Sequence, residues 1–196
     1  MSDRVIRVVQ YGLGPIGSAM VRHVVERNGL ELVGGVDIDP DKAGKDIGDV
    51  VGLDTPLGIP VAQNLAQILE KRPADVVLHT TGSFFDLFED QIVEVLSEGL
   101  DVVSTSEELS FPWLAHPEAA ARIDAAALRA GKTVLGTGVN PGFLMDTLPL
   151  ALTALCQRVD RIDVTRRMNA SLRRGPFQKK IGAGMTVEAF HAQMEK

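Results

Sequence analysis

The chain has 196 residues, of which 45% are hydrophobic, and a formal net charge of −6 at pH 7. This length allows one complete buried core and part of a second lobe, and the acidic balance disfavours nucleic acid, whose binding needs a basic face. The single cysteine excludes internal disulfides and cysteine-rich zinc sites, and no apolar run is long enough to cross a membrane, so we expect a soluble cytoplasmic protein.

Short apolar runs bounded by Gly, Asp or Pro alternate with segments of helical periodicity. The expected buried strands are 5–11, 32–36, 76–78, 102–104 and 133–135, and the expected helices are 16–28, 65–71, 86–97 and 118–130. Parallel strands need crossover connections, so this alternation predicts an α/β fold with a doubly wound parallel sheet. We therefore expect a Rossmann domain over residues 1–143.

The first expected strand ends in a glycine-rich turn that opens the next helix. Gly12, Gly14 and Gly17 have the G-x-G-x-x-G spacing of dinucleotide-binding loops. They would permit a tight turn, close approach of a pyrophosphate, and packing of the helix on the strand. Pro15 and Ile16 complete the loop at the helix N-terminus, where the pyrophosphate would bind. A glycine turn without any ligand is the alternative.

Asp37 ends the second expected strand, 20 residues after Gly17 (37 − 17). A carboxylate in this position typically accepts hydrogen bonds from the adenosine ribose of NAD. Lys42 and Lys45 in the next loop could face a 2′-phosphate, so NADP stays open as a second cofactor. An aspartate that only starts a turn is the alternative. The loop that follows, 39–60, is the longest irregular stretch expected.

Hydroxyl and acidic residues follow two later strands, at the sheet edge where open α/β proteins bind ligands. The residues expected to contact the cofactor here are Thr80, Thr81, Gly82, Ser83 and Thr105. Glu107 and Glu108 would place a carboxylate next to the reacting centre, although a charge pair starting a helix is an equally good interpretation. His79 fits a hydrogen-bonded core histidine, and His116 fits a surface position.

A turn-dense segment, 136–143, follows the last expected strand of the domain. We expect Asn140 to contact the cofactor and Phe143 and Met145 to line the substrate pocket, with simple loop packing as the alternative. Further on, we expect a helix from Asp146, as N-cap, to about Cys156, then a long strand over 159–172 and the first turns of a helix over 186–196. These last elements cannot bury their apolar faces alone. We therefore expect residues 144–196 to form a connector and the beginning of a second, truncated α+β domain.

Together these residues resemble the 2,4-diaminopentanoate dehydrogenase family, which includes native amine dehydrogenases and is related in its N-terminal domain to dihydrodipicolinate reductases. The matching segments are 12–17, 36–46, 104–109, 136–146 and 173–182. The resemblance implies oxidative deamination of an amine, or reductive amination of a ketone with ammonia, using NAD or NADP and no metal. It also implies a homodimer when the chain is full length.

The same resemblance assigns the nitrogen-handling role to Glu108, with Glu107 as the reserve. A carboxylate can hold ammonia as a nucleophile and manage protons while the carbinolamine collapses. Two other functions stay open. One is a dihydrodipicolinate reductase-like imine reductase, although the chain lacks the adjacent His-His pair that this reading would require. The other is a non-catalytic dinucleotide-binding fragment.

Overall fold

A computed structural model of the chain describes residues 4–172 and 175–194, and it divides between Cys156 and Gln157 into two compact units. The first unit holds a six-stranded sheet of order β3-β2-β1-β4-β5-β6 in which all neighbours are parallel. The strands are β1 (Ile6–Tyr11), β2 (Leu30–Val36), β3 (Val61–Ala62), β4 (Val76–His79), β5 (Asp101–Ser104) and β6 (Val134–Gly136). This order confirms the predicted doubly wound sheet, and it places the switch in strand order between β1 and β4.

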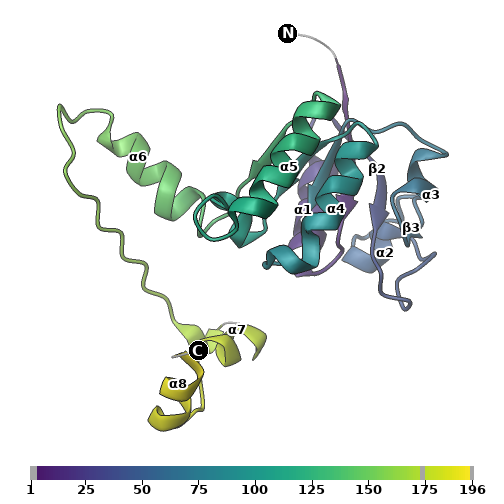
Figure 1. Cartoon of the computed structure of the whole chain (residues 1–196). Helices are drawn as coiled ribbons and strands as arrows, with labels where there is room; N and C mark the ends of the chain where they lie inside the picture. Colours follow the sequence, from purple (N-terminus) through teal and green to yellow (C-terminus); the bar gives the residue numbers. More distant parts are fainter. Residues whose placement is uncertain (1–3, 173–174, 195–196) are drawn as a thin grey trace. The chain divides into compact units, whose positions relative to one another are not determined.

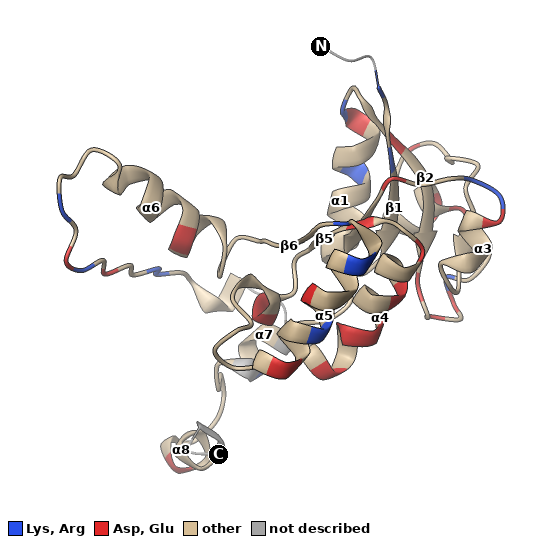
Figure 2. Cartoon of the chain, turned by 45° about the horizontal axis from the view of Figure 1, so that its top comes forward, with Lys and Arg blue, Asp and Glu red and all other residues tan. Residues whose placement is uncertain are grey.

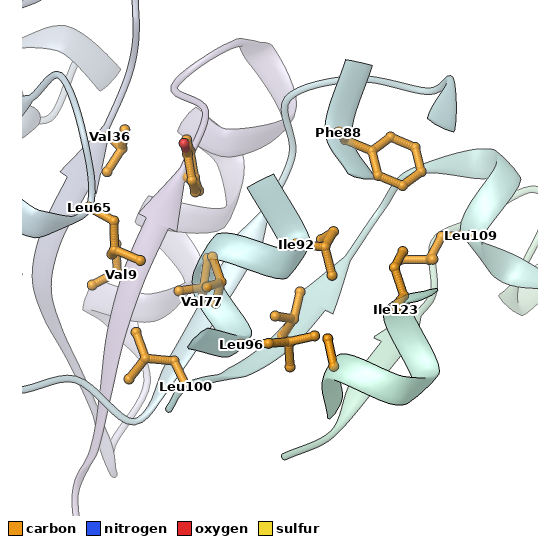
Figure 3. Packing of buried hydrophobic residues seen from close by; sticks show 14 of the residues in the cluster. Val9, Val36, Leu65, Val77, Phe88, Ile92, Leu96, Leu100, Leu109 and Ile123 are labelled. Atoms are coloured by element: carbon orange, nitrogen blue, oxygen red, sulfur yellow. The ribbon is translucent and has the colours of Figure 1, made fainter. Parts of the chain in front are cut away.

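Helices cover both faces of the sheet (Figure 1). They are α1 (Pro15–Glu26), α2 (Ile47–Val51), α3 (Ala66–Leu69), α4 (Phe85–Ser97) and α5 (Pro117–Ala130), with a 3₁₀ turn η1 (Glu107–Ser110). Successive residues of a strand face opposite sides, so Val8 belongs to a core that includes residues of α1 and α2, while Val9 belongs to a second core that includes residues of α3, α4 and α5. In Figure 3, Phe88, Ile92 and Leu96 follow one stripe of α4 into the second of these cores.

The charged residues of α4 are all acidic, and Figure 2 shows them along its surface. Glu89 of α4 accepts hydrogen bonds from the guanidinium of Arg122 on α5, which ties the two helices together on their solvent side. Among the described residues, no helix combines the length and the apolar composition that crossing a bilayer requires.

The prediction that residues 39–60 are irregular is wrong in part, because this segment contains α2. The Asp46 carboxylate accepts hydrogen bonds from the backbone N–H groups of Gly48, Leu57 and Ile59, so one side chain caps α2 and folds the following turn back on it. These bonds outweigh burial and lower the pKa of Asp46. The glycines of this segment hid the helix, because glycine disfavours helix by about 1 kcal/mol relative to alanine.

Two expectations for the C-terminal part are also wrong. Asp146 is not an N-cap: it lies inside a π-helical turn, η2 (Phe143–Thr147), its carboxylate accepts from the Gly142 N–H, and α6 runs over Leu148–Thr153. The predicted strand over 159–172 does not form, because no described segment offers it a ladder partner, and it ends in a 3₁₀ turn, η3 (Ala170–Leu172).

Two helices follow in the second unit, α7 (Gly175–Lys180), which the pattern did not predict, and α8 (Val187–Met194). The second confirms the helix expected over 186–196 as far as residue 194; residues 195–196 lie outside the described part. Within this unit, the Ala189 N–H donates to the Thr186 hydroxyl, which caps the start of α8.

Candidate active site

The glycine turn between β1 and α1 is closed on one side and open on the other. A Cβ built on Gly17 would lie 1.8 Å from the Gly12 carbonyl oxygen, so only glycine lets α1 begin this close to the strand. Gly12 has φ +92°, which also favours glycine. A Cβ on Gly14 meets no atom within 4 Å. The backbone at Gly14, just before Pro15 opens α1, can therefore be approached from outside.

A cavity of about 220 Å³ lies over this turn, at the carboxyl ends of β1, β2 and β4. It is lined by Tyr11, Gly12, Gly14, Val36, Asp37, Ile38, Lys42, Thr80, Thr81 and Gln91. It brings together five residues predicted from the sequence, namely Gly12, Gly14, Asp37, Thr80 and Thr81. It also lies at the switch point between β1 and β4, where doubly wound sheets bind ligands.

Asp37 is the acidic residue of this cavity lining. Its carboxylate accepts hydrogen bonds from the backbone N–H of Leu13 at 2.8 Å and of Asp39 at 2.9 Å. Burial alone would raise the pKa of Asp37, but the ammonium of Lys42, 2.8 Å away, and these N–H groups together lower it. Asp37 is therefore an anion that is fixed in orientation and linked directly to the glycine turn.

The turn is braced by a polar residue that sequence reasoning missed. Gln10, fully buried in β1, donates from Nε2 to the Gly12 carbonyl at 3.0 Å and to the Thr80 hydroxyl at 2.9 Å. Thr80 in turn donates to the same Gly12 carbonyl. The available signal was a glutamine in the middle of an otherwise apolar strand, since polar groups are rarely buried without a partner.

His79 is buried at the end of β4, as expected for a hydrogen-bonded core histidine. Its Nδ1 lies 3.0 Å from the Ser104 hydroxyl and its Nε2 lies 2.8 Å from both Gln91 Oε1 and the Thr81 hydroxyl. Burial lowers the pKa of His79, so the ring is neutral at pH 7. The network fixes Thr81 at the rim of the cavity.

Tyr11, the only tyrosine in the sequence, provides a direct test of this environment. Burial, reinforced by the Glu94 carboxylate, raises the pKa of Tyr11 to about 12. We expect the absorbance of the folded protein at the tyrosinate band to titrate with a midpoint near 12, against about 10 in denaturant. The folded state holds this proton more tightly, so stability should decline as pH rises from about 10 to about 12. A native midpoint near the denatured value would contradict the burial of this ring.

A second cavity, of about 700 Å³, lies beside the first unit's β5 and β6. Its lining includes Glu107, Glu108 and Asp146, together with the imidazole of His116, and no lysine or arginine belongs to that described lining. Both cavities open near the carboxyl ends of parallel strands. Because its described lining carries three carboxylates and no lysine or arginine, the second cavity favours a cationic or ammonia-like group.

Glu108 is held in place by two groups from other segments. Its Oε2 accepts the N–H of Phe85, the first residue of α4, at 2.7 Å, and lies 3.1 Å from Nε2 of His116. The imidazole also packs on the Phe85 ring, with centroids 4.8 Å apart. His116 is thus a partner of Glu108 rather than a plain surface residue. The Glu108 carboxylate does contact a helix N-terminus, as the alternative interpretation expected. That helix is α4, however, and not the 3₁₀ turn η1 that contains Glu108.

The loops after β4 and β5 are fastened to each other. The Ser106 hydroxyl donates to the Gly82 carbonyl at 2.6 Å, and the Glu108 N–H donates to the Ser83 carbonyl at 3.4 Å. These contacts bring the predicted cofactor loop next to the predicted catalytic glutamate. The predicted residues outside both cavity linings are Pro15, Ile16, Gly17, Gly82, Ser83, Thr105, Asn140, Phe143 and Met145. The roles of these residues, and of the predicted residues that do line the two cavities, stay predictions.

Comparison with known proteins adds independent findings. The sequence profile described as "Dihydrodipicolinate reductase, N-terminus" matches residues 6–103. The chain is 33% identical to the 2,4-diaminopentanoate dehydrogenase of Acetoanaerobium sticklandii, over 97% of this chain and 54% of that protein. It therefore spans about half the length of this curated relative.

Comparison with solved structures also finds dehydrogenases. An amine dehydrogenase from Mycobacterium smegmatis matches with a TM-score of 0.71 and 32% identity, over 79% of this chain and 45% of that one. The WlbA dehydrogenase from Bordetella pertussis, solved with NADH and UDP-GlcNAcA, matches with a TM-score of 0.52 and 25% identity, over 69% of this chain and 36% of that one.

Proposed function

The chain belongs to the family of dihydrodipicolinate reductase N-terminal domains, and from this premise we propose that it binds NAD or NADP and that the complete gene product is an amine dehydrogenase. The reaction would be oxidative deamination of an amine or diamino acid, or in reverse the reductive amination of a ketone with ammonia. The similarity to a 2,4-diaminopentanoate dehydrogenase and to an amine dehydrogenase structure supports this substrate class.

The cavity at the glycine turn fits a dinucleotide. The open backbone at Gly14 and the start of α1 suit a pyrophosphate, and the oriented carboxylate of Asp37 suits a ribose hydroxyl. Thr80 and Thr81 continue the same cavity toward the loop after β4. The bound cofactor supplies or accepts the hydride. The residues that line the cavity would orient it.

The observation that carries the amine assignment is Glu108. It is a carboxylate fixed by the Phe85 N–H in an acidic cavity, on a loop fastened to the proposed cofactor loop. Its negative charge would attract ammonium, and its free lone pairs would accept a proton from the attacking nitrogen and return one to the departing hydroxyl. Glu107, exposed in the same cavity lining, is the reserve for this role.

Further parts of the proposal concern the rest of the chain. Residues 1–143 would form the cofactor domain, and residues 144–196 the connector and the beginning of a substrate and dimerisation domain. Asn140 would contact the cofactor, and Phe143 and Met145 the substrate. We propose a cytoplasmic homodimer for the complete gene product.

The test is an assay of the complete gene product with NADH or NADPH, small ketones, 2-amino-4-oxo acids, and ammonia. We expect cofactor oxidation that requires both ketone and ammonia. Turnover of a cyclic imine without ammonia would instead support an imine reductase. Cofactor binding without any turnover would support a non-catalytic binding module.

A further inference from the structure

The geometry points to Lys42 as the residue that decides whether the cofactor cavity accepts a 2′-phosphorylated dinucleotide. Its ammonium lies 2.8 Å from Oδ2 of Asp37 and 3.7 Å from Oδ2 of Asp39, and its side chain lines the same cavity. We propose that Lys42 neutralises Asp37 and so lets the site take NADP alongside NAD. This inference rests on the proposed dinucleotide function and deepens it.

The position of Lys42 is built into the fold. Its backbone N–H donates to the Asp39 carbonyl, and the carbonyl of Lys42 accepts from Lys45, which forms a turn directly after Asp37. The Gly44 N–H donates to the Val61 carbonyl, so the turn is anchored on β3. The Lys42 side chain is only 26% exposed. The hydrogen-bonded loop therefore holds Lys42 next to Asp37.

The contact with Lys42 uses part of the limited hydrogen-bonding capacity of Asp37. A carboxylate offers about four acceptor sites, and three are used, by the Asp39 N–H on Oδ1 and by the Leu13 N–H and Lys42 on Oδ2. The remaining capacity suits a single ribose hydroxyl. Lys42 therefore competes with the sugar for this carboxylate while it cancels the charge that would repel a phosphate.

An ammonium has three donors and its partners can be exchanged. Facing NADP, the same group can turn from Asp37 to the 2′-phosphate, where a charge-assisted hydrogen bond is stronger than one to a neutral hydroxyl. The neighbouring Ile38 side chain is 81% exposed and brings no charge of its own. Asp37 and Lys42 are the charged residues among those that line this cavity, and Asp39 Oδ2 lies 3.7 Å from the Lys42 ammonium.

The test measures binding rather than turnover, by titrating the purified protein with NADH and with NADPH and following nicotinamide fluorescence. Wild-type protein should bind both. In Lys42→Met, the Kd for NADPH should rise about tenfold or more, which is about 1.4 kcal/mol, while the Kd for NADH stays constant or falls. Asp37→Asn should change the ratio in the opposite direction, because it releases Lys42 and removes the repulsive charge.

Lys45→Met is the matched control. It removes the same charge from the same loop, but Lys45 is exposed and does not line the cavity, so the ratio of the two Kd values should not change. Wild-type protein that binds NADH and rejects NADPH would overturn the role of Lys42, and so would equal shifts for both cofactors in Lys42→Met. Failure to bind either cofactor would refute the proposed function itself.

Discussion

Replacing Glu108 by glutamine should lower ammonia-dependent oxidation of NAD(P)H by at least about 100-fold, the usual contribution of a general acid or base. The amide has nearly the same shape and can still accept the Phe85 N–H that the carboxylate accepts at 2.7 Å. It cannot attract ammonium or take up a proton. We therefore expect cofactor affinity and the free energy of unfolding to remain close to wild type, since the contact with His116 is partly exposed and contributes about 1 kcal/mol or less.

Glu107→Gln, measured beside it, decides between the two adjacent carboxylates. A large loss in Glu107→Gln with full activity in Glu108→Gln would transfer the catalytic role to Glu107. Glu98→Gln is a matched control for net charge, because Glu98 is exposed at the C-cap of α4, outside both cavity linings. Full ammonia-dependent activity in all three variants would refute a carboxylate at this position as the nitrogen-handling group.

Gly17→Ala should destabilise the cofactor domain by about 3 kcal/mol, the upper part of the range for overpacking a core. The new Cβ would lie 1.8 Å from the Gly12 carbonyl oxygen and 2.8 Å from the Thr80 hydroxyl, and the nearest atom is backbone that cannot move without opening the turn. Denaturant unfolding monitored by circular dichroism measures the effect. NADH binding should be lost in the same variant.

Gly14→Ala separates packing from ligand approach. Its φ is −71° and its Cβ would meet no atom of the protein within 4 Å, so stability should change by less than about 0.5 kcal/mol. NADH affinity should nevertheless fall, because the methyl group occupies the side from which the pyrophosphate approaches. Equal stability of Gly17→Ala and wild type would contradict the close contact of α1 with the turn. Undiminished NADH binding by Gly14→Ala would place the ligand elsewhere.

Local patterns explain why most of the first unit could be predicted. The strand at Ile6–Tyr11, the glycine spacing that follows it and the helix from Pro15 are all encoded within a few consecutive residues. The strand over 159–172 was mispredicted from the same kind of pattern, because alternation states only that a segment could pair. Whether it does depends on a neighbouring strand, and none exists in the described part of the chain.

The sequence by itself determined the parallel sheet, the glycine turn, the acidic residue after β2 and the glutamates after β5, because backbone periodicity and turn chemistry act over short distances. Only the tertiary structure decided which side chains meet there. Gln10 bonds to Thr80 across neighbouring strands, and His116 reaches Glu108 from the start of another helix. Lys42 meets Asp37 because a hydrogen-bonded loop turns it back toward the sheet. Such partnerships depend on how separate segments pack, and residue spacing does not encode that packing.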